Sequence, residues 1–128
     1  MLKKAKILVI DDEEDICHFS KSILEKTTKF EVLVCTNALE GIEMAKKHLP
    51  DLILLDINMP HMDGGGVAQS LLESKSTSSI PIVFLTALLR KAEAEENTGE
   101  IAGRFFIAKP VDPKELVQRI KSILNIED

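Results

Sequence analysis

The chain has 128 residues, of which 45% are hydrophobic and 29% are charged, and this composition excludes disordered and collagen-like proteins. The formal net charge of -5 leaves no broad basic face, so we do not expect direct nucleic-acid binding. No apolar run approaches the ~18 residues of a membrane span, and the first apolar run is too short for a signal peptide. We expect one domain over residues 1–128, in the cytoplasm and away from membranes.

Five short apolar runs rich in Val, Ile and Leu recur along the chain. They cover residues 6–10, 31–35, 52–56, 82–86 and 105–108. Runs of this length and composition predict strands that are buried on both faces, which is typical of a parallel sheet covered by helices.

Segments with helical spacing of apolar residues alternate with these strands. The predicted inward-facing residues are Ile16, Phe19, Ile23 and Leu24 in the first helix, Leu39, Ile42 and Ala45 in the second, Val67, Leu71 and Leu72 in a weaker third, and Leu116, Val117, Ile120, Ile123 and Leu124 in the last. A further, less distinct helix is expected within residues 88–102. This alternation predicts a doubly wound α/β sheet with right-handed crossovers.

Two of these helices have clear starting signals. Asn37, with Glu40 three residues later, predicts a capping box at the second helix. Asp112 as N-cap, followed by Pro113 at the first helical position, predicts the start of the last helix. These signals fix where the preceding strand-to-helix loops end.

In the doubly wound class, ligands bind outside the carboxyl ends of the strands. Five chemically suitable residues follow or end the predicted strands: Asp11, Asp12, Asp56, Thr86 and Lys109. If the sheet order is 2-1-3-4-5, the first and third strands are neighbours. All five side chains would then converge on one cleft.

Three carboxylates that lie close together repel each other unless a cation joins them. Mg²⁺ prefers oxygen ligands and retains several waters, which suits aspartates together with a backbone carbonyl such as that of Asn58. Lys109 would supply a positive charge to a phosphoryl group and Thr86 a hydroxyl donor. Asp56 could then attack phosphorus and become an aspartyl phosphate.

Four stretches, ILVIDDEED, PDLILLDINMPHMDG, IVFLTA and FFIAKPVDPKEL, extend over essentially the whole chain. In their order and spacing they resemble the receiver domain of two-component response regulators. The resemblance implies a flavodoxin-like, five-stranded parallel sheet of order 2-1-3-4-5 with helices on both faces.

The resemblance also implies roles for the carboxylates. Asp56 would be the phosphoacceptor, and Asp12, Asp56 and the carbonyl of Asn58 would bind Mg²⁺, with Asp11 acting largely through water. The expected phosphoryl donor is a sensor histidine kinase or a histidine phosphotransfer protein, and an unspecified downstream protein would read the result.

Three other residues receive roles from the same resemblance. Thr86 and Lys109 would contact the phosphoryl group, and Phe106 would be the aromatic residue whose rotamer is coupled to Thr86. A cis bond between Lys109 and Pro110 is implied as well. Phe106 is equally compatible with a simple role as a core aromatic.

The resulting hypothesis is a phosphorylation-operated signalling domain that catalyses only its own phosphorylation and dephosphorylation. It would be either a complete single-domain regulator or a receiver from a longer protein. The alternatives are a receiver fold that binds partners without phosphorylation and a phosphatase like the haloacid dehalogenases. The phosphatase motif has a second Asp two residues after the nucleophile, where this chain has Asn58; hydrolysis of a generic phosphate ester would identify it.

Other reactive residues are expected to be structural. Cys17 and Cys35 lack a C-x-x-C spacing, so we expect two reduced, apolar side chains and no disulfide. His18, His48 and His61 are too scattered to suggest a metal site.

Overall fold

The computed structural model describes residues 4–56, 64–86, 100–101, 104–108 and 112–126. Their strands are β1 (Ala5–Ile10), β2 (Phe30–Cys35), β3 (Leu52–Asp56), β4 (Ile82–Thr86), β5 (Glu100–Ile101) and β6 (Arg104–Ala108). Their helices are α1 (Glu14–Glu25), α2 (Ala38–His48), α3 (Gly64–Glu73) and α5 (Pro113–Leu124).

The strands of the described residues form one sheet in the order β2-β1-β3-β4-β6-β5. Five of them, β2, β1, β3, β4 and β6, are parallel, so the predicted order 2-1-3-4-5 is confirmed with β6 as the fifth predicted strand. Each of the five lies within one residue of its predicted range. Continuous apolar runs predict these strands well because helices cover both faces of the sheet.

Strand β5 was not predicted. Its two residues pair antiparallel with β6, Glu100 opposite Phe105 and Ile101 opposite Arg104. The prediction of a helix within 88–102 is therefore wrong at Glu100 and Ile101, which form a strand. Residues 88–99 and 102 lie outside the described residues. A two-residue strand is too short to produce a recognisable alternation of apolar residues.

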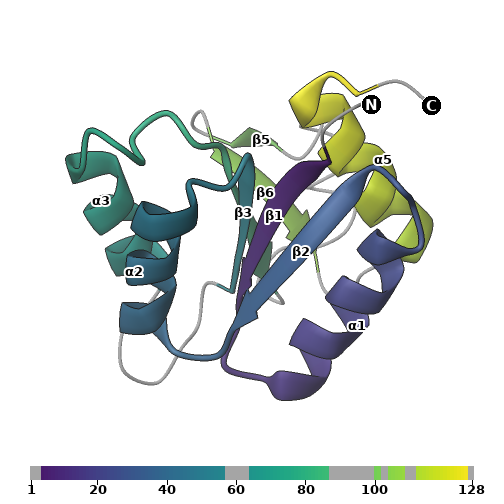
Figure 1. Ribbon diagram of the computed structural model, residues 1–128, viewed down its shortest axis with the longest axis horizontal. Helices are drawn as coiled ribbons and strands as arrows, with labels where there is room; N and C mark the ends of the chain where they lie inside the picture. The colour runs from purple at the N-terminus through teal and green to yellow at the C-terminus, as the bar shows by residue number, and fades with distance from the viewer. Residues whose placement is uncertain (1–3, 57–63, 87–99, 102–103, 109–111, 127–128) are drawn as a thin grey trace.

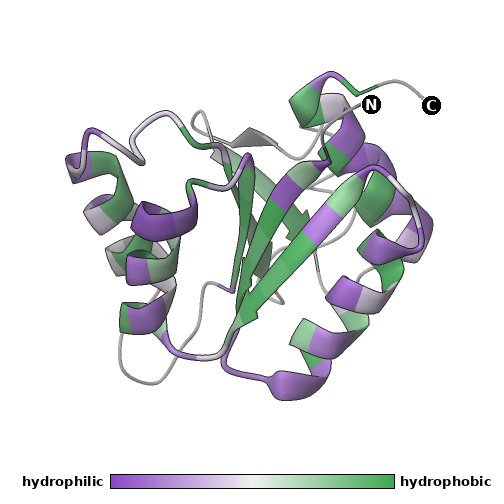
Figure 2. Ribbon diagram, viewed as in Figure 1, coloured by the Kyte–Doolittle hydropathy of each residue, from purple (hydrophilic) through white to green (hydrophobic). Residues whose placement is uncertain are grey.

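Helices cover both faces of the sheet, as predicted (Figure 1). One core cluster joins the sheet to α1 and α5 through buried residues such as Leu24, Leu116 and Ile120. The other joins it to α2 and α3 through Ile42, Val67 and Leu71 among others. The strands are mostly apolar, while the helices carry both polar and apolar residues (Figure 2). In the described part of the chain, no helix is both long and apolar enough to cross a membrane.

The predicted helix starts are confirmed. The Asp112 side chain accepts hydrogen bonds from the N–H groups of Lys114 and Glu115, at 2.9 and 3.2 Å, and Pro113 begins α5. Asn37 Oδ1 accepts from the N–H of Glu40 at 3.1 Å at the start of α2. Each cap satisfies N–H groups that the helix itself leaves without partners, a contribution of about 1 kcal/mol.

The predicted inner helix faces need correction at three positions. Phe19, Leu39 and Leu72 are exposed, with 43%, 64% and 47% of their surface accessible. In α1 and α2, several of the buried positions carry small residues. They are Cys17 and Ser20 in α1 and Ala38, Gly41 and Ala45 in α2.

Gly41 shows why small residues are needed there. A Cβ atom at this position would lie 2.7 Å from Ile10 Cδ1 and 2.9 Å from Ile10 Cγ1. Helix α2 therefore approaches the last residue of β1 more closely than a side chain would allow. The apolar spacing of the sequence gives no information about this distance.

Candidate functional site

Three carboxylates meet at the carboxyl ends of β1 and β3. These strands are neighbours, with Ile10 opposite Leu55, so Asp11 and Asp56 leave the sheet side by side. Asp11, Asp12 and Asp56 each offer a carboxylate oxygen, and the three oxygens lie within 4.8 Å of one another. Asp11 is 0% and Asp56 is 4% exposed, whereas Asp12 is exposed.

Asp11 is held by its backbone and its side chain. Its N–H donates to the carbonyl of Cys35 at 3.0 Å, which continues the ladder between β1 and β2. Its Oδ1 accepts from the N–H of Glu13 at 2.9 Å, and its carbonyl accepts from Cys17 Sγ at 3.3 Å. The first residue after β1 is therefore fixed in position before any ligand binds.

The two cysteines are free thiols and are buried, as predicted. Burial, together with the nearby carboxylate of Asp11, raises the pKa of the Cys17 thiol to about 11. Burial also raises the pKa of Cys35, whose Sγ donates to the carbonyl of Asn37 at 3.1 Å. Both thiols stay protonated at neutral pH and act as donors to backbone carbonyls.

The grouping of Asp11, Asp12 and Asp56 is compatible with a metal site. Like charges within 5 Å in a partly buried place repel one another, and a divalent cation relieves that repulsion. The donors are all oxygens, which favours a hard ion over zinc or copper. Within the described ranges it is the one group of His, Cys, Asp and Glu with such geometry.

The remaining predicted residues are described only in part. Thr86 ends β4, one strand away from Asp56, and its backbone pairs with Ala108 of β6. Asn58, Lys109 and the Lys109–Pro110 bond lie outside the described residues. The backbone therefore brings the ends of β1, β3, β4 and β6 to one edge of the sheet.

Phe106 lies in the middle of β6 and is partly buried. Its ring stacks on Phe84, with ring centroids 5.2 Å apart and an interplanar angle of 23°. This position suits a core aromatic, and the coupling of the Phe106 rotamer to Thr86 stays a prediction.

His18 in α1 is exposed and His48 in the last turn of α2 is partly buried; His61 lies outside the described residues. The two described histidines do not belong to the carboxylate group.

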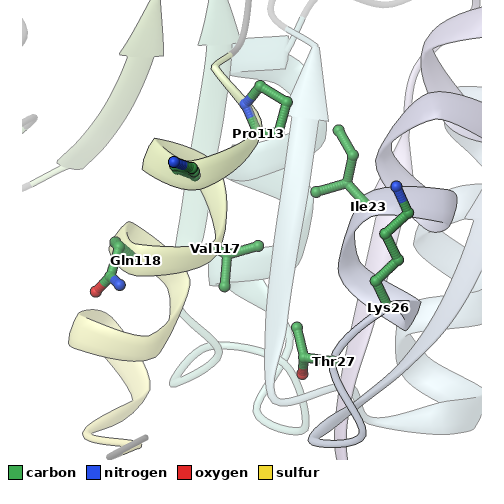
Figure 3. A pocket seen from close by; sticks show the side chains of 7 residues that line it. Ile23, Lys26, Thr27, Pro113, Val117 and Gln118 are labelled. Atoms are coloured by element: carbon green, nitrogen blue, oxygen red, sulfur yellow. The ribbon is translucent and has the colours of Figure 1, made fainter.

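A shallow groove lies elsewhere, between α1 and α5, with a volume of about 390 Å³. Ile23 and Val117 face it from the two helices, with Pro113 near one end and Thr27 near the other (Figure 3). Its described lining includes Lys26 and Lys114 but no carboxylate or thiol. The candidate site therefore remains at the carboxyl ends of the strands.

The family model described as "Response regulator receiver domain" matches residues 7–121. The chain belongs to this family. Receiver domains are signalling modules of two-component systems, and the strand order and the group of three carboxylates described above fit that assignment.

Curated relatives of the chain are named as transcriptional or response regulators. The chain is 39% identical to "Probable transcriptional regulator ycf27" of Porphyra purpurea, over 98% of the chain and 50% of the relative. It is 34% identical to "Response regulator Rre1" of Synechocystis, over 97% of the chain and 53% of the relative. It is 38% identical to "Transcriptional regulatory protein SrrA" of Staphylococcus aureus, over 94% and 48%. The chain thus spans about half the length of these relatives.

Solved structures support the fold. A response regulator from Desulfuromonas acetoxidans aligns with a TM-score of 0.76 and 32% identity, over 94% of this chain and 97% of that one. The chemotaxis protein CheY4 of Vibrio cholerae aligns with a TM-score of 0.80 over 94% and 99%, at 24% identity, and shows likeness of fold alone.

Sequence reasoning missed the contacts that hold Asp11. It treated Cys17 as a small apolar residue, whereas the thiol donates to the carbonyl of Asp11. It also passed over Arg119, which donates to the carbonyl of Phe106 at 3.2 Å. The signal in the sequence for these two contacts was a residue able to donate a hydrogen bond, Cys17 in α1 and Arg119 in α5. Such a signal is weak on its own.

Proposed function

We propose that the chain accepts a phosphoryl group on Asp56 in the presence of Mg²⁺. The supporting observation is the position of Asp56, 4% exposed at the end of a core strand and within 4.8 Å of the carboxylate oxygens of Asp11 and Asp12. A carboxylate held by a rigid strand loses little orientational freedom when it attacks, which favours the reaction. In that step an Asp56 oxygen bonds to phosphorus and the bond from phosphorus to the donor's imidazole nitrogen breaks.

Asp11, Asp12, Asp56 and the carbonyl of Asn58 would hold the metal ion. When bound, Mg²⁺ supplies positive charge that offsets the charge on the phosphoryl oxygens. Asp12 is exposed, so a metal ion can reach it from solvent. Asp11 is held in place because its Oδ1 accepts a hydrogen bond from the N–H of Glu13. This arrangement accounts for two buried like charges at one edge of the sheet.

Lys109 and Thr86 are proposed to contact the phosphoryl group from the neighbouring strands. The carboxyl ends of β4 and β6 lie at the same edge of the sheet as Asp56. Thr86 ends β4, and Lys109 is the next residue in the sequence after Ala108, where β6 ends. An ammonium group and a hydroxyl group donate hydrogen bonds to phosphoryl oxygens, and these donors also compensate the charge that develops during transfer.

The proposed donor is the phosphohistidine of a sensor kinase or of a phosphotransfer protein, as membership of the family implies. Phosphorylation would change the packing of Phe106 near Thr86 and thereby the surface offered to a downstream protein. We place this exchange in the cytoplasm and assign it to one domain over residues 1–128.

The test is the intact mass of the protein after incubation with acetyl phosphate and Mg²⁺. We expect an adduct of about 80 Da, one HPO₃ unit, because a carboxylate nucleophile forms a covalent intermediate. Asp56→Asn should abolish the adduct, and Asp51→Asn, at the other end of β3, should leave it intact. No adduct at any Mg²⁺ or donor concentration would indicate a receiver domain that binds partners without phosphorylation.

A further inference from the structure

The side chain of Arg119 in helix α5 makes a hydrogen bond to the backbone of strand β6. Arg119 Nη2 donates to the carbonyl of Phe106 at 3.2 Å, and Arg119 Nη1 lies 3.7 Å from Glu115 Oε1 on the same helix. The two side chains are 18% and 24% exposed. The planar fork of the guanidinium group allows Arg119 to donate a hydrogen bond to the Phe106 carbonyl and to form an ion pair with Glu115 at the same time.

Phe106 is therefore held at two points. Its ring stacks on Phe84, which is 1% exposed and lies directly opposite it in the pairing of β4 with β6. Its carbonyl is held from α5 by Arg119. The first contact fixes the ring and the second fixes the peptide group that follows it.

These two contacts are physically linked. The direction of a residue's carbonyl is set by its ψ angle, and the rotamers open to a side chain depend on φ and ψ. A donor that fixes the carbonyl of Phe106 therefore favours one rotamer of its ring. The bond to Arg119 opposes any shift of this carbonyl that accompanies movement of the ring away from Phe84.

We propose that Arg119 is a positioning residue that holds Phe106 in its stacked arrangement and so opposes the switch that phosphorylation of Asp56 produces. This inference rests on the proposed function. Phosphorylation and Arg119 would then act in opposite directions on one two-state element. Removing the hydrogen bond should shift the population toward the switched arrangement before any phosphoryl group is present.

The experiment uses 4-fluorophenylalanine incorporated at the five Phe positions, with the Phe106 resonance assigned from Phe106→Leu. Fluorine spectra are recorded with and without Mg²⁺ and beryllofluoride, a mimic of the acyl phosphate. Arg119→Gln removes the fork, and Glu115→Gln removes the negative charge of its ion-pair partner. Gln118→Ala is the control, since Gln118 is exposed on the same helix beside Arg119.

In Arg119→Gln without beryllofluoride, the Phe106 resonance should move toward its position in the beryllofluoride complex of the wild type. Half-saturation should need about threefold to tenfold less beryllofluoride, because one partly exposed hydrogen bond made in only one state shifts a population by that much. Glu115→Gln should show a smaller shift in the same direction, and Gln118→Ala should match the wild type.

If Arg119→Gln matches the wild type in resonance position and half-saturation, the inference is wrong, although the proposed function stands. If the wild type neither binds beryllofluoride nor gains an acyl phosphate, the proposed function itself has failed.

Discussion

The neighbouring strands β1 and β3 carry charged residues at both ends, and the two ends differ in how those charges are arranged. At the amino end, Asp51 Oδ2 accepts from the N–H of Lys6 at 2.7 Å, and the N–H of Asp51 donates to the carbonyl of Lys6 at 2.7 Å. Lys6 Nζ also donates to the carbonyl of His48, the last residue of α2, at 3.4 Å. These groups complete backbone hydrogen bonding near solvent.

At the carboxyl end the charges are alike and largely buried. Asp11 and Asp56 are 0% and 4% exposed, and their carboxylates meet that of Asp12. Burial of like charges is unfavourable for folding. The amino end thus shows what charged residues do for the fold, and the carboxyl end shows a group of carboxylates that is compatible with a metal site.

The largest expected effect of pH on stability comes from the buried thiol behind Asp11. The pKa of Cys17 is raised from 9.0 to about 11 by burial and by the Asp11 carboxylate. The folded state therefore holds the proton to a higher pH than the unfolded state, so this stabilisation is complete below about pH 9 and is lost as pH rises toward 11.

The expected loss is roughly 2 to 3 kcal/mol for a shift of this size. Urea unfolding of the wild type and Cys17→Val between pH 8 and 11 measures it. The difference in unfolding free energy between the two proteins should decrease across that range. A difference independent of pH would show that the thiol titrates equally in both states.

If Mg²⁺ binds as proposed, its effect on stability should distinguish the two ends sharply. At a Mg²⁺ concentration ten times its Kd, the wild type should gain about 1.4 kcal/mol of stability, because the ion binds only the folded state. Asp12→Asn should lose most of this gain, since one of three carboxylates is removed. Asp51→Asn should keep it, and thermal unfolding with and without Mg²⁺ provides the comparison. An equal loss in both variants would show that the ion does not prefer the carboxyl end.

The close approach of α2 to the carboxyl end of β1 can be tested with Gly41→Ala. The new Cβ would lie 2.7 to 3.1 Å from three atoms of Ile10, and such overpacking costs about 1 to 3 kcal/mol. Alanine regains about 1 kcal/mol of helix propensity, so we expect a net destabilisation of about 1 kcal/mol in urea unfolding. A stabilised variant would mean that Ile10 moves aside at little cost.

The smallest effect is expected at the amino end. Asp51→Ala removes the acceptor for the N–H of Lys6, but water can replace it because Asp51 is exposed. We expect a loss of about 0.5 kcal/mol in unfolding free energy and no change in Mg²⁺ affinity. A change in Mg²⁺ affinity would show that the two ends are coupled through β1 and β3.

Much of the fold could be predicted because parallel strands are buried on both faces. The ranges of β3 and β4 were predicted to the residue, since continuous apolar runs define them without ambiguity. Helix faces were harder: Phe19 and Leu39 fit the apolar spacing but are exposed, because close packing selected Cys17 and Gly41 for the inner faces. Apolar periodicity reports hydrophobic surface and does not report the distance between elements.

The grouping of the carboxylates was predictable for the same topological reason. Carboxyl ends of adjacent parallel strands share an edge, so Asp11 and Asp56 could be brought together from their places in the sequence. Two contacts around these strand ends could not be predicted, because the donation from Cys17 to the carbonyl of Asp11 and that from Arg119 to the carbonyl of Phe106 follow no spacing rule. They depend on how each helix lies on the sheet.

The most direct test of the central claim is to locate the acyl phosphate chemically. After phosphorylation with acetyl phosphate and Mg²⁺, borohydride reduces an aspartyl phosphate to homoserine, and peptide mass spectrometry then identifies the residue. The account predicts homoserine at position 56, dependent on Mg²⁺. Homoserine at position 11, 12 or 51, or none after a confirmed mass gain, would contradict it.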